Sequence, residues 1–292
     1  MRARLRRIAV VGHTGRPGVR RAAAALGRRL ARRGCEVRLE QALAATMGRE
    51  GEPAARLAAW CHLLVALGGD GTVIAGGRAL AGRRGVLLGV NFGGLGFLAA
   101  AEQGELDHAV DAALAGTWPV VARPLLRARV LRGGRAVRRG YAMNDAVVRG
   151  FGGHTAVHLR MHALGQDLGH LVADGVIAAT PAGSTAYSLS AGGPVLAPAV
   201  EALVVTPVCA HSLGSRSLVL PPDDEVGLRL IGSLDHAVLV LDGQEPLPLE
   251  PGDDVRIRLE RAAVRCLDNP GRPFARSLQR KLGWQGSTRR SM

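Results

Sequence analysis

The chain has 292 residues, and its 47% hydrophobic and 21% charged residues are typical of a soluble globular protein with a sizeable core. Its formal net charge of +14 comes almost entirely from arginine, since Lys281 is the only lysine, and reflects either a composition bias or an attraction for anionic partners such as phosphorylated small molecules. The arginines are spread through every segment and aromatic residues make up only 3%, which argues against a nucleic-acid-binding protein with stacking platforms.

The N-terminal part of the chain predicts strands that alternate with helices. Short apolar or alternating segments predict strands at 6–12, 35–40, 62–67 and 85–90. Apolar residues at helical spacing predict helices at 19–30, 54–60, 73–80 and 105–114. This alternation predicts an α/β domain over residues 1–118, with a Rossmann-like open and mostly parallel sheet whose ligands bind at the carboxyl ends of the strands.

From residue 119 onward, segments of alternating apolar and polar residues follow one another with few helix signals between them. A turn at Gly133-Gly134 joins two of them, and others lie at 155–164, 217–232, 236–244 and 253–266. We therefore expect a second, β-rich domain over residues 119–266. Residues 267–292 are basic and partly helical, and we expect them to pack back on the N-terminal domain.

The stretch Gly68-Gly69-Asp70-Gly71-Thr72 ends a buried strand with three glycines around one acid. Glycines expose backbone N–H groups that can hold phosphate oxygens, because a Cβ would keep the phosphate at a distance. A carboxylate beside a phosphate opposes anion binding, unless it holds Mg²⁺ or accepts a proton from an attacking hydroxyl. The alternative is a tight strand-to-helix turn in which Asp70 caps the helix.

Two further polar segments are candidates for ligand binding. Residues 179–194 combine hydroxyl side chains with small residues, which let a ligand approach the backbone and offer it directional hydrogen bonds; a surface turn cluster has the same composition. The pair Asn144-Asp145, between strand-like flanks, suits the vicinal hydroxyls of a ribose or a polar turn at a strand end. Asp174, just before the hydroxyl-rich segment, has the same two interpretations.

Cysteine spacing and the apolar segments indicate a cytoplasmic protein. The four cysteines are too far apart for a zinc site or a redox pair, and widely spaced single cysteines suit a reducing compartment. The apolar stretch near the N-terminus, Ile8 to Val11, is too short for a signal peptide. The longest later apolar segment contains Glu201 and two prolines, so we expect no membrane partner.

Taken together, these segments resemble the NAD kinases. The glycine stretch 68–72 resembles the family's signature loop, and 89–99 the segment that follows it. Asn144-Asp145 stands at the family's Asn-Glu, and 174–194 resembles its most specific block. Three shorter segments follow in the family's order, at 211–221, 241–244 and 281–284. Lipid kinases and phosphofructokinases have a similar glycine loop but lack the block around Thr185-Ala186-Tyr187.

The resemblance implies transfer of the γ-phosphoryl group of ATP to the 2′-hydroxyl of the adenosine ribose of NAD, which gives NADP. It implies that Asp70 is the base for that hydroxyl and that Gly68, Gly69, Gly71 and Thr72 hold phosphates. The implied NAD-binding residues are Asn144, Asp145, Asp174, Thr185, Ala186, Tyr187, Ser188, Leu189, Ser190 and Gln244. Mg²⁺ would arrive with ATP rather than in a protein metal site. A homodimer or homotetramer is also implied, and polyphosphate is an open alternative donor.

Three positions depart from the family pattern. Asp145 replaces a glutamate and shortens its reach by about 1.5 Å, Ala182 replaces a threonine, and Val172 stands where many members have a basic residue. Two alternatives to the NAD kinase remain. One is a kinase of a lipid or sugar hydroxyl, against which residues 185–190 argue. The other is a non-catalytic nucleotide sensor, for which Asp145 is the only support.

Overall fold

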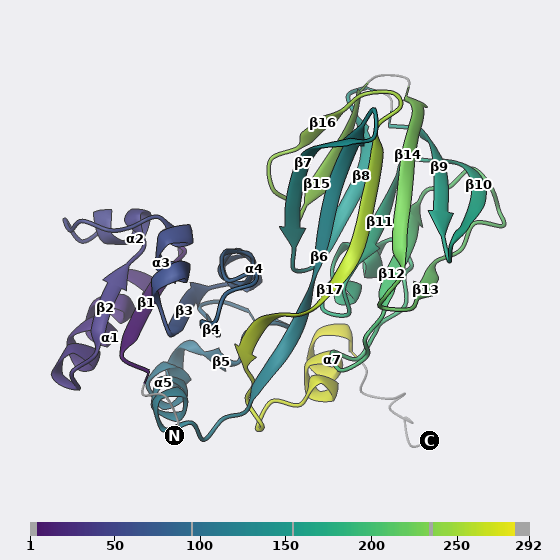
Figure 1. Ribbon diagram of the computed structural model, residues 1–292. Helices are drawn as coiled ribbons and strands as arrows, with labels where there is room; N and C mark the ends of the chain where they lie inside the picture. The colour runs from purple at the N-terminus through teal and green to yellow at the C-terminus, as the bar shows by residue number, and fades with distance from the viewer. Residues whose placement is uncertain (1–4, 95, 154, 234–235, 284–292) are drawn as a thin grey trace, which may run out of the picture. The chain divides into compact units, whose positions relative to one another are not determined.

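The structure is a computed structural model, and it describes residues 5–94, 96–153, 155–233 and 236–283 (Figure 1). The chain divides into two compact units, here called unit 1 (Met1–Ala122 with Val264–Met292) and unit 2 (Arg123–Ala263). It passes from unit 1 to unit 2 within strand β6 (Val120–Arg132) and returns within strand β17 (Asp254–Leu267). Each unit has its own core and is described by itself.

Unit 1 contains a parallel sheet in the order β2–β1–β3–β4. Its strands are β1 (Arg7–Gly12), β2 (Glu36–Leu39), β3 (Leu63–Gly68) and β4 (Val86–Asn91). β3 and β4 are buried along their whole length, which explains why their sequences are continuous apolar runs rather than alternating ones. β5 (Ala101–Glu102) and the end of β17 also pair with β4, both in parallel. The predicted open α/β sheet is confirmed.

Four of the helices of unit 1 lie where apolar spacing predicts them. The helices of this unit are α1 (Val19–Arg32), α2 (Gln41–Ala45), α3 (Ala54–Trp60), α4 (Asp70–Ala79), η1 (Gln103–Glu105), α5 (Leu106–Ala115) and α7 (Phe274–Leu282). On α1 the buried residues Val19, Ala23 and Leu26 lie on one face, as helical periodicity requires. The sequence did not predict α2, whose first N–H groups are capped by the Glu40 carboxylate.

Unit 2 is built from antiparallel strands in two sheets. One has the order β13–β12–β11–β8–β15–β16; in the other, β10, β9, β14 and β17 pair in turn, and β17 pairs with β6 and β6 with β7. Their bounds are β7 (Arg135–Ala142), β8 (Asp145–Phe151), β9 (Val157–Ala163), β10 (Gln166–Ala173), β11 (Gly175–Ala179), β12 (Leu203–Val208), β13 (Leu218–Leu220), β14 (Glu225–Ser233), β15 (His236–Leu241) and β16 (Leu247–Leu249). Val148 and Ala178 of the first sheet share a buried cluster with Leu228 and Ile257 of the second, so the core lies between the sheets.

Short helices interrupt unit 2 after β11. The hydroxyl-rich segment of the sequence folds into η2 (Gly183–Thr185) and α6 (Tyr187–Ser190). Among the described residues, no helix is long and apolar enough to span a membrane.

Candidate functional site

The glycine stretch forms the turn from β3 into α4. Gly68 ends the strand, and a Cβ there would overlap the hydroxyl of Thr72, whereas a Cβ at Gly71 would point into open space. Glycine at 68 is therefore required by packing, and glycine at 71 keeps the loop open to a ligand. Helix α4 begins at Asp70, three residues earlier than the sequence predicts, and its N-cap is Gly69 with no side-chain cap. The interpretation of Asp70 as a helix cap is therefore wrong.

The carboxylate of Asp70 instead binds the chain segment that follows β4. Its Oδ2 accepts a hydrogen bond from the Phe97 N–H at 3.0 Å, and its Oδ1 accepts one from the Leu98 N–H at 3.4 Å. A Cβ at Gly96 would overlap Oδ1. The two family-like segments, 68–72 and 89–99, are therefore joined through one carboxylate; Leu95 of the second lies outside the described residues.

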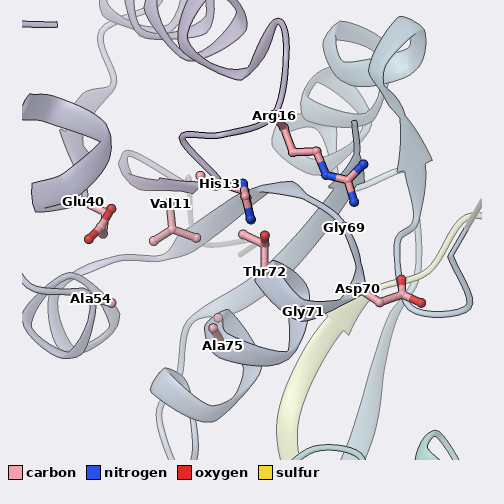
Figure 2. Close-up of a pocket in the computed structure, with 12 residues that line it drawn as sticks. Val11, His13, Arg16, Glu40, Ala54, Gly69, Asp70, Gly71, Thr72 and Ala75 are labelled. Atoms are coloured by element: carbon pink, nitrogen blue, oxygen red, sulfur yellow. The ribbon is translucent and has the colours of Figure 1, made fainter. Parts of the chain in front are cut away.

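A cavity of about 510 Å³ opens beside this loop (Figure 2). Gly69, Asp70, Gly71 and Thr72 form one wall, and His13 and Arg16, from the turn after β1, lie near them. The Arg16 guanidinium packs over glycine, because a Cβ at Gly93 would overlap it and one at Gly69 would lie 3.5 Å from it.

Arg16 and the N-terminus of α4 both favour a bound anion at this wall. Within the described ranges, no carboxylate forms an ion pair with Arg16. The amino end of a helix carries partial positive charge, and its first N–H groups lack partners within the helix. This wall of the cavity therefore suits phosphate groups. The sequence does not single out Arg16, because no local pattern distinguishes it from the other arginines.

In unit 2, the pair Asn144-Asp145 is held by a second acid, Asp242. The Asp242 carboxylate accepts hydrogen bonds from three successive backbone N–H groups, those of Met143 at 2.8 Å, Asn144 at 2.7 Å and Asp145 at 3.2 Å. Asp242 follows β15 with a φ of 50°, a left-handed conformation that aspartate tolerates. The sequence did not predict a role for Asp242. The Asp-Gly dipeptide at 242–243 predicts a turn there, but it does not identify the backbone that Asp242 binds.

The start of the hydroxyl-rich segment packs against the same pair. The Thr180 hydroxyl donates to the Met143 carbonyl at 2.7 Å, and the Thr180 N–H donates to the Asn144 carbonyl at 2.9 Å. A Cβ at Gly183 would overlap that Asn144 carbonyl. The structure thus brings together two predicted segments that are more than thirty residues apart in the sequence.

Two features of the pair suit a polar ligand. Asp145 is 6% exposed, and burial followed by the negative charge of Asp242 raises its pKa to about 6. The Oδ1 atom of Asn144 is buried and has no hydrogen-bond partner among the described residues. Because buried polar atoms are normally satisfied, this oxygen can accept a hydrogen bond from a bound molecule.

Known proteins are similar to this chain over most of its length. Residues 8–118 match the family model of the ATP-NAD kinase N-terminal domain, and residues 143–267 match that of the ATP-NAD kinase C-terminal domain. An NAD kinase of Burkholderia pseudomallei is 36% identical over 280 residues, which cover 95% of this chain and 93% of that protein. An NAD kinase of Symbiobacterium thermophilum is 41% identical over 256 residues, or 87% of this chain and 90% of that one. The chain belongs to the NAD kinase family.

Solved structures of NAD kinases have the same fold. The yeast NADH kinase complexed with NADH has a TM-score of 0.90 and 26% identity, and the alignment covers 100% of this chain and 91% of that one. An NAD kinase from Archaeoglobus fulgidus in complex with ATP has a TM-score of 0.74 and 22% identity, over 95% of this chain and 97% of that one. The chain is a phosphotransferase of the NAD kinase family, and neither a lipid or sugar kinase nor a sensor is favoured.

The other residues that the NAD kinase resemblance implies lie in varied surroundings. Asp174 accepts a hydrogen bond from the Thr155 hydroxyl at 2.7 Å, and Tyr187 is 44% exposed. The hydroxyl of Ser188 is buried and hydrogen-bonded to the hydroxyl of Thr206 at 2.9 Å. Gln244 is exposed and donates only weakly to the Asp242 carbonyl. Thr185, Ala186 and Leu189 are partly buried, and Ser190 is exposed.

Proposed function

We propose that this NAD kinase transfers the γ-phosphoryl group of ATP to the 2′-hydroxyl of the adenosine ribose of NAD, with Asp70 as the base. One observation carries the proposal: Asp70 lies in the wall of the cavity, and two backbone N–H groups hold its carboxylate in a fixed orientation. Both oxygens keep acceptor capacity, since an ionised carboxylate has about four lone-pair sites. Asp70 can therefore accept a hydrogen bond from a ribose hydroxyl without losing its anchors.

The proton moves late in the proposed reaction. A carboxylate is much too weak a base to ionise a ribose hydroxyl in advance, so Asp70 aligns the hydroxyl and takes its proton as the oxygen–phosphorus bond forms. The bond from the γ-phosphorus to the bridging oxygen breaks at the same time, and ADP leaves with that electron pair. Positioning and neutralisation of charge supply most of the catalysis in such a loose transition state.

Gly68, Gly69, Gly71, Thr72 and Arg16 would hold the phosphates of ATP. Within the described part of the chain, no group of three or more His, Cys, Asp or Glu side chains is arranged to hold a metal ion. Mg²⁺ would be held by the phosphates and water rather than by a protein cage. The ion would neutralise charge on the phosphoryl oxygens.

Unit 2 would bind NAD. Asn144 and Asp145 would hold its hydroxyl or amide groups, supported by the partnerless Asn144 oxygen. Asp174, Thr185, Ala186, Tyr187, Leu189, Ser190 and Gln244 would line the rest of the site, and Ser188 would support it through its bond to Thr206. A cytoplasmic location is also proposed, on the wide spacing of the cysteines, and a homodimer or homotetramer is proposed on the family resemblance.

The proposed reaction is tested by identifying the product that the purified protein forms. Purified protein is incubated with NAD, ATP and Mg²⁺, and the 2′-phosphorylated product is measured with an NADP-specific dehydrogenase. Parallel reactions replace NAD with NADH, a sugar or diacylglycerol vesicles, and ATP with polyphosphate. We expect NADP from NAD and ATP. Phosphorylation of the sugar or the lipid alone, or NAD binding without turnover, would contradict the proposal.

A further inference from the structure

The single lysine of the chain lies beside Asp70. The Lys281 Nζ atom, on α7, is 3.8 Å from the Asp70 Oδ2 atom. The same ammonium lies over the Phe97 ring, 4.4 Å from its centroid. Phe97 in turn donates its backbone N–H to the same Asp70 oxygen. One ammonium, one ring and one carboxylate therefore form a closed set of contacts inside unit 1.

Helix α7 is fixed in place by contacts that do not involve Asp70. The Phe274 ring lies 6.1 Å from the Phe97 ring, and Leu278 is buried. Just before the helix, Arg272 forms ion pairs with Glu102 at 3.1 Å and with Glu105 at 2.7 Å. The helix therefore presents Lys281 from a docked position. Trp284, of the family-like segment 281–284, lies outside the described residues.

We propose that Lys281 is a positioning residue for phosphoryl transfer. Its ammonium holds the Asp70 carboxylate in the orientation that receives the ribose hydroxyl, and it offsets the negative charge of that carboxylate next to the phosphates of ATP. The inference rests on the proposed role of Asp70 and adds a second residue to it.

Electrostatics explain why such a cation is needed. A carboxylate and a triphosphate repel each other, and a cation next to the carboxylate reduces that repulsion. The side chains of Lys281 and Asp70 are 28% and 29% exposed, so solvent screens their attraction only in part. When Asp70 accepts the hydroxyl proton it becomes neutral, while Lys281 keeps its own proton. The positive charge then remains beside the transferring group.

The choice of lysine at this position is itself informative. Of the 38 lysine and arginine residues in the chain, the other 37 are arginine. An ammonium is a compact point charge, whereas a guanidinium is a wide planar fork. A compact charge suits a place between an aromatic face and a single carboxylate oxygen. We therefore expect arginine to restore the function of Lys281 only in part.

Steady-state kinetics of the full-length protein test the inference. Lys281→Met removes the charge and keeps an unbranched side chain, and Lys281→Arg keeps the charge. Arg280→Met is the matched control, because Arg280 lies on the same helix and its guanidinium is 3.7 Å from Glu102 instead of Asp70. For Lys281→Met we expect kcat to fall about tenfold or more and the KM for ATP to rise, because the Asp70 charge then opposes the triphosphate, with the KM for NAD within about twofold of the wild type. Lys281→Arg should recover part of kcat, and Arg280→Met should match the wild type.

Three results would overturn the inference. One is an unchanged kcat in Lys281→Met. Another is a loss that Arg280→Met shares, and the third is a loss accompanied by a lower Tm and not recovered in Lys281→Arg. The variant Asp70→Asn, assayed alongside, separates this failure from a failure of the proposed function. If kcat falls strongly in Asp70→Asn but not in Lys281→Met, only the role of Lys281 is contradicted. If Asp70→Asn keeps full activity, the role of Asp70 as the base is contradicted.

Discussion

Two carboxylates in family-like motifs, Asp70 in unit 1 and Asp145 in unit 2, lie in opposite environments. Asp70 is partly exposed, accepts two backbone N–H groups and faces an ammonium. Asp145 is 6% exposed and faces a second carboxylate, and its pKa is raised to about 6. The same type of side chain therefore has different surroundings in the two units. The Asp70 carboxylate is held at a fixed point, as alignment of a bound hydroxyl requires, whereas the buried Asp145 carboxyl suits recognition of a polar ligand.

Two glycine substitutions should separate these environments in kinetics. Gly96→Ala would push on the Asp70 carboxylate, and we expect kcat to fall by about a hundredfold with little change in the KM for NAD. Gly183→Ala would push on the Asn144 carbonyl, and we expect mainly a higher KM for NAD. Steady-state rates at varied NAD measure both.

The matched controls are Gly104→Ala in unit 1 and Gly232→Ala in unit 2. A Cβ at either position would meet nothing within 4 Å, so both should behave as the wild type. The comparison between the two carboxylates would fail if Gly96→Ala raised the KM for NAD and left kcat unchanged.

The raised pKa of Asp145 should make the free energy of unfolding depend on pH. Its pKa is about 6 in the folded protein against 3.8 normally. Between these values the folded protein binds a proton that the unfolded chain has lost, so the free energy of unfolding should fall as pH rises from about 4 to about 6, and then level off. The shift of about two pKa units corresponds to roughly 3 kcal/mol.

Urea unfolding between pH 4 and 8 measures this effect. Asp145→Asn should lack the decline, so its stability relative to the wild type should improve as pH rises. Asp167→Asn is the control. The hydrogen bond from the Arg160 guanidinium, followed by one from the Gly169 N–H, lowers the pKa of Asp167 to about 2, so its contribution is lost only below about pH 4. Parallel curves for the wild type and Asp145→Asn would contradict the assignment.

Arg16 should affect the binding of ATP rather than that of NAD. Its guanidinium packs against Gly93, and Arg16 lines the same cavity as Gly69, Gly71 and Thr72. Removing one phosphate-binding charge in Arg16→Met should raise the KM for ATP by about tenfold, because a charge-assisted hydrogen bond contributes roughly 1.5 kcal/mol or more. Arg20→Met, an exposed arginine on α1, is the control. If Arg16→Met changed only the KM for NAD, the expected role of Arg16 in ATP binding would be contradicted.

The sequence predicts the parts of this molecule that depend on local pattern. Buried strands such as β3 and β4 are continuous apolar runs, and the glycines of 68–71 identify the loop after β3. The sequence predicts the start of α4 at residue 73 instead of Asp70, because Gly71 has a low helix propensity and interrupts the helical pattern in the first turn.

The contacts that complete the two sites could not be predicted from the sequence. Arg16 and Gly93 meet only through the folded sheet, and nothing local distinguishes Arg16 from other arginines. Asp242 lies almost a hundred residues from the backbone that it holds, so its Asp-Gly dipeptide predicts a turn but not a partner. Long-range pairing of this kind is a property of the tertiary structure rather than of local pattern.

The most direct test of the account is the rate of NADP formation by Asp70→Asn compared with the wild type. Asp107→Asn serves as control, since Asp107 is a largely exposed acid on α5 of the same unit. The account predicts that kcat falls by about 10²- to 10⁴-fold in Asp70→Asn and stays unchanged in Asp107→Asn. Wild-type turnover in Asp70→Asn would contradict the assignment of Asp70 as the base.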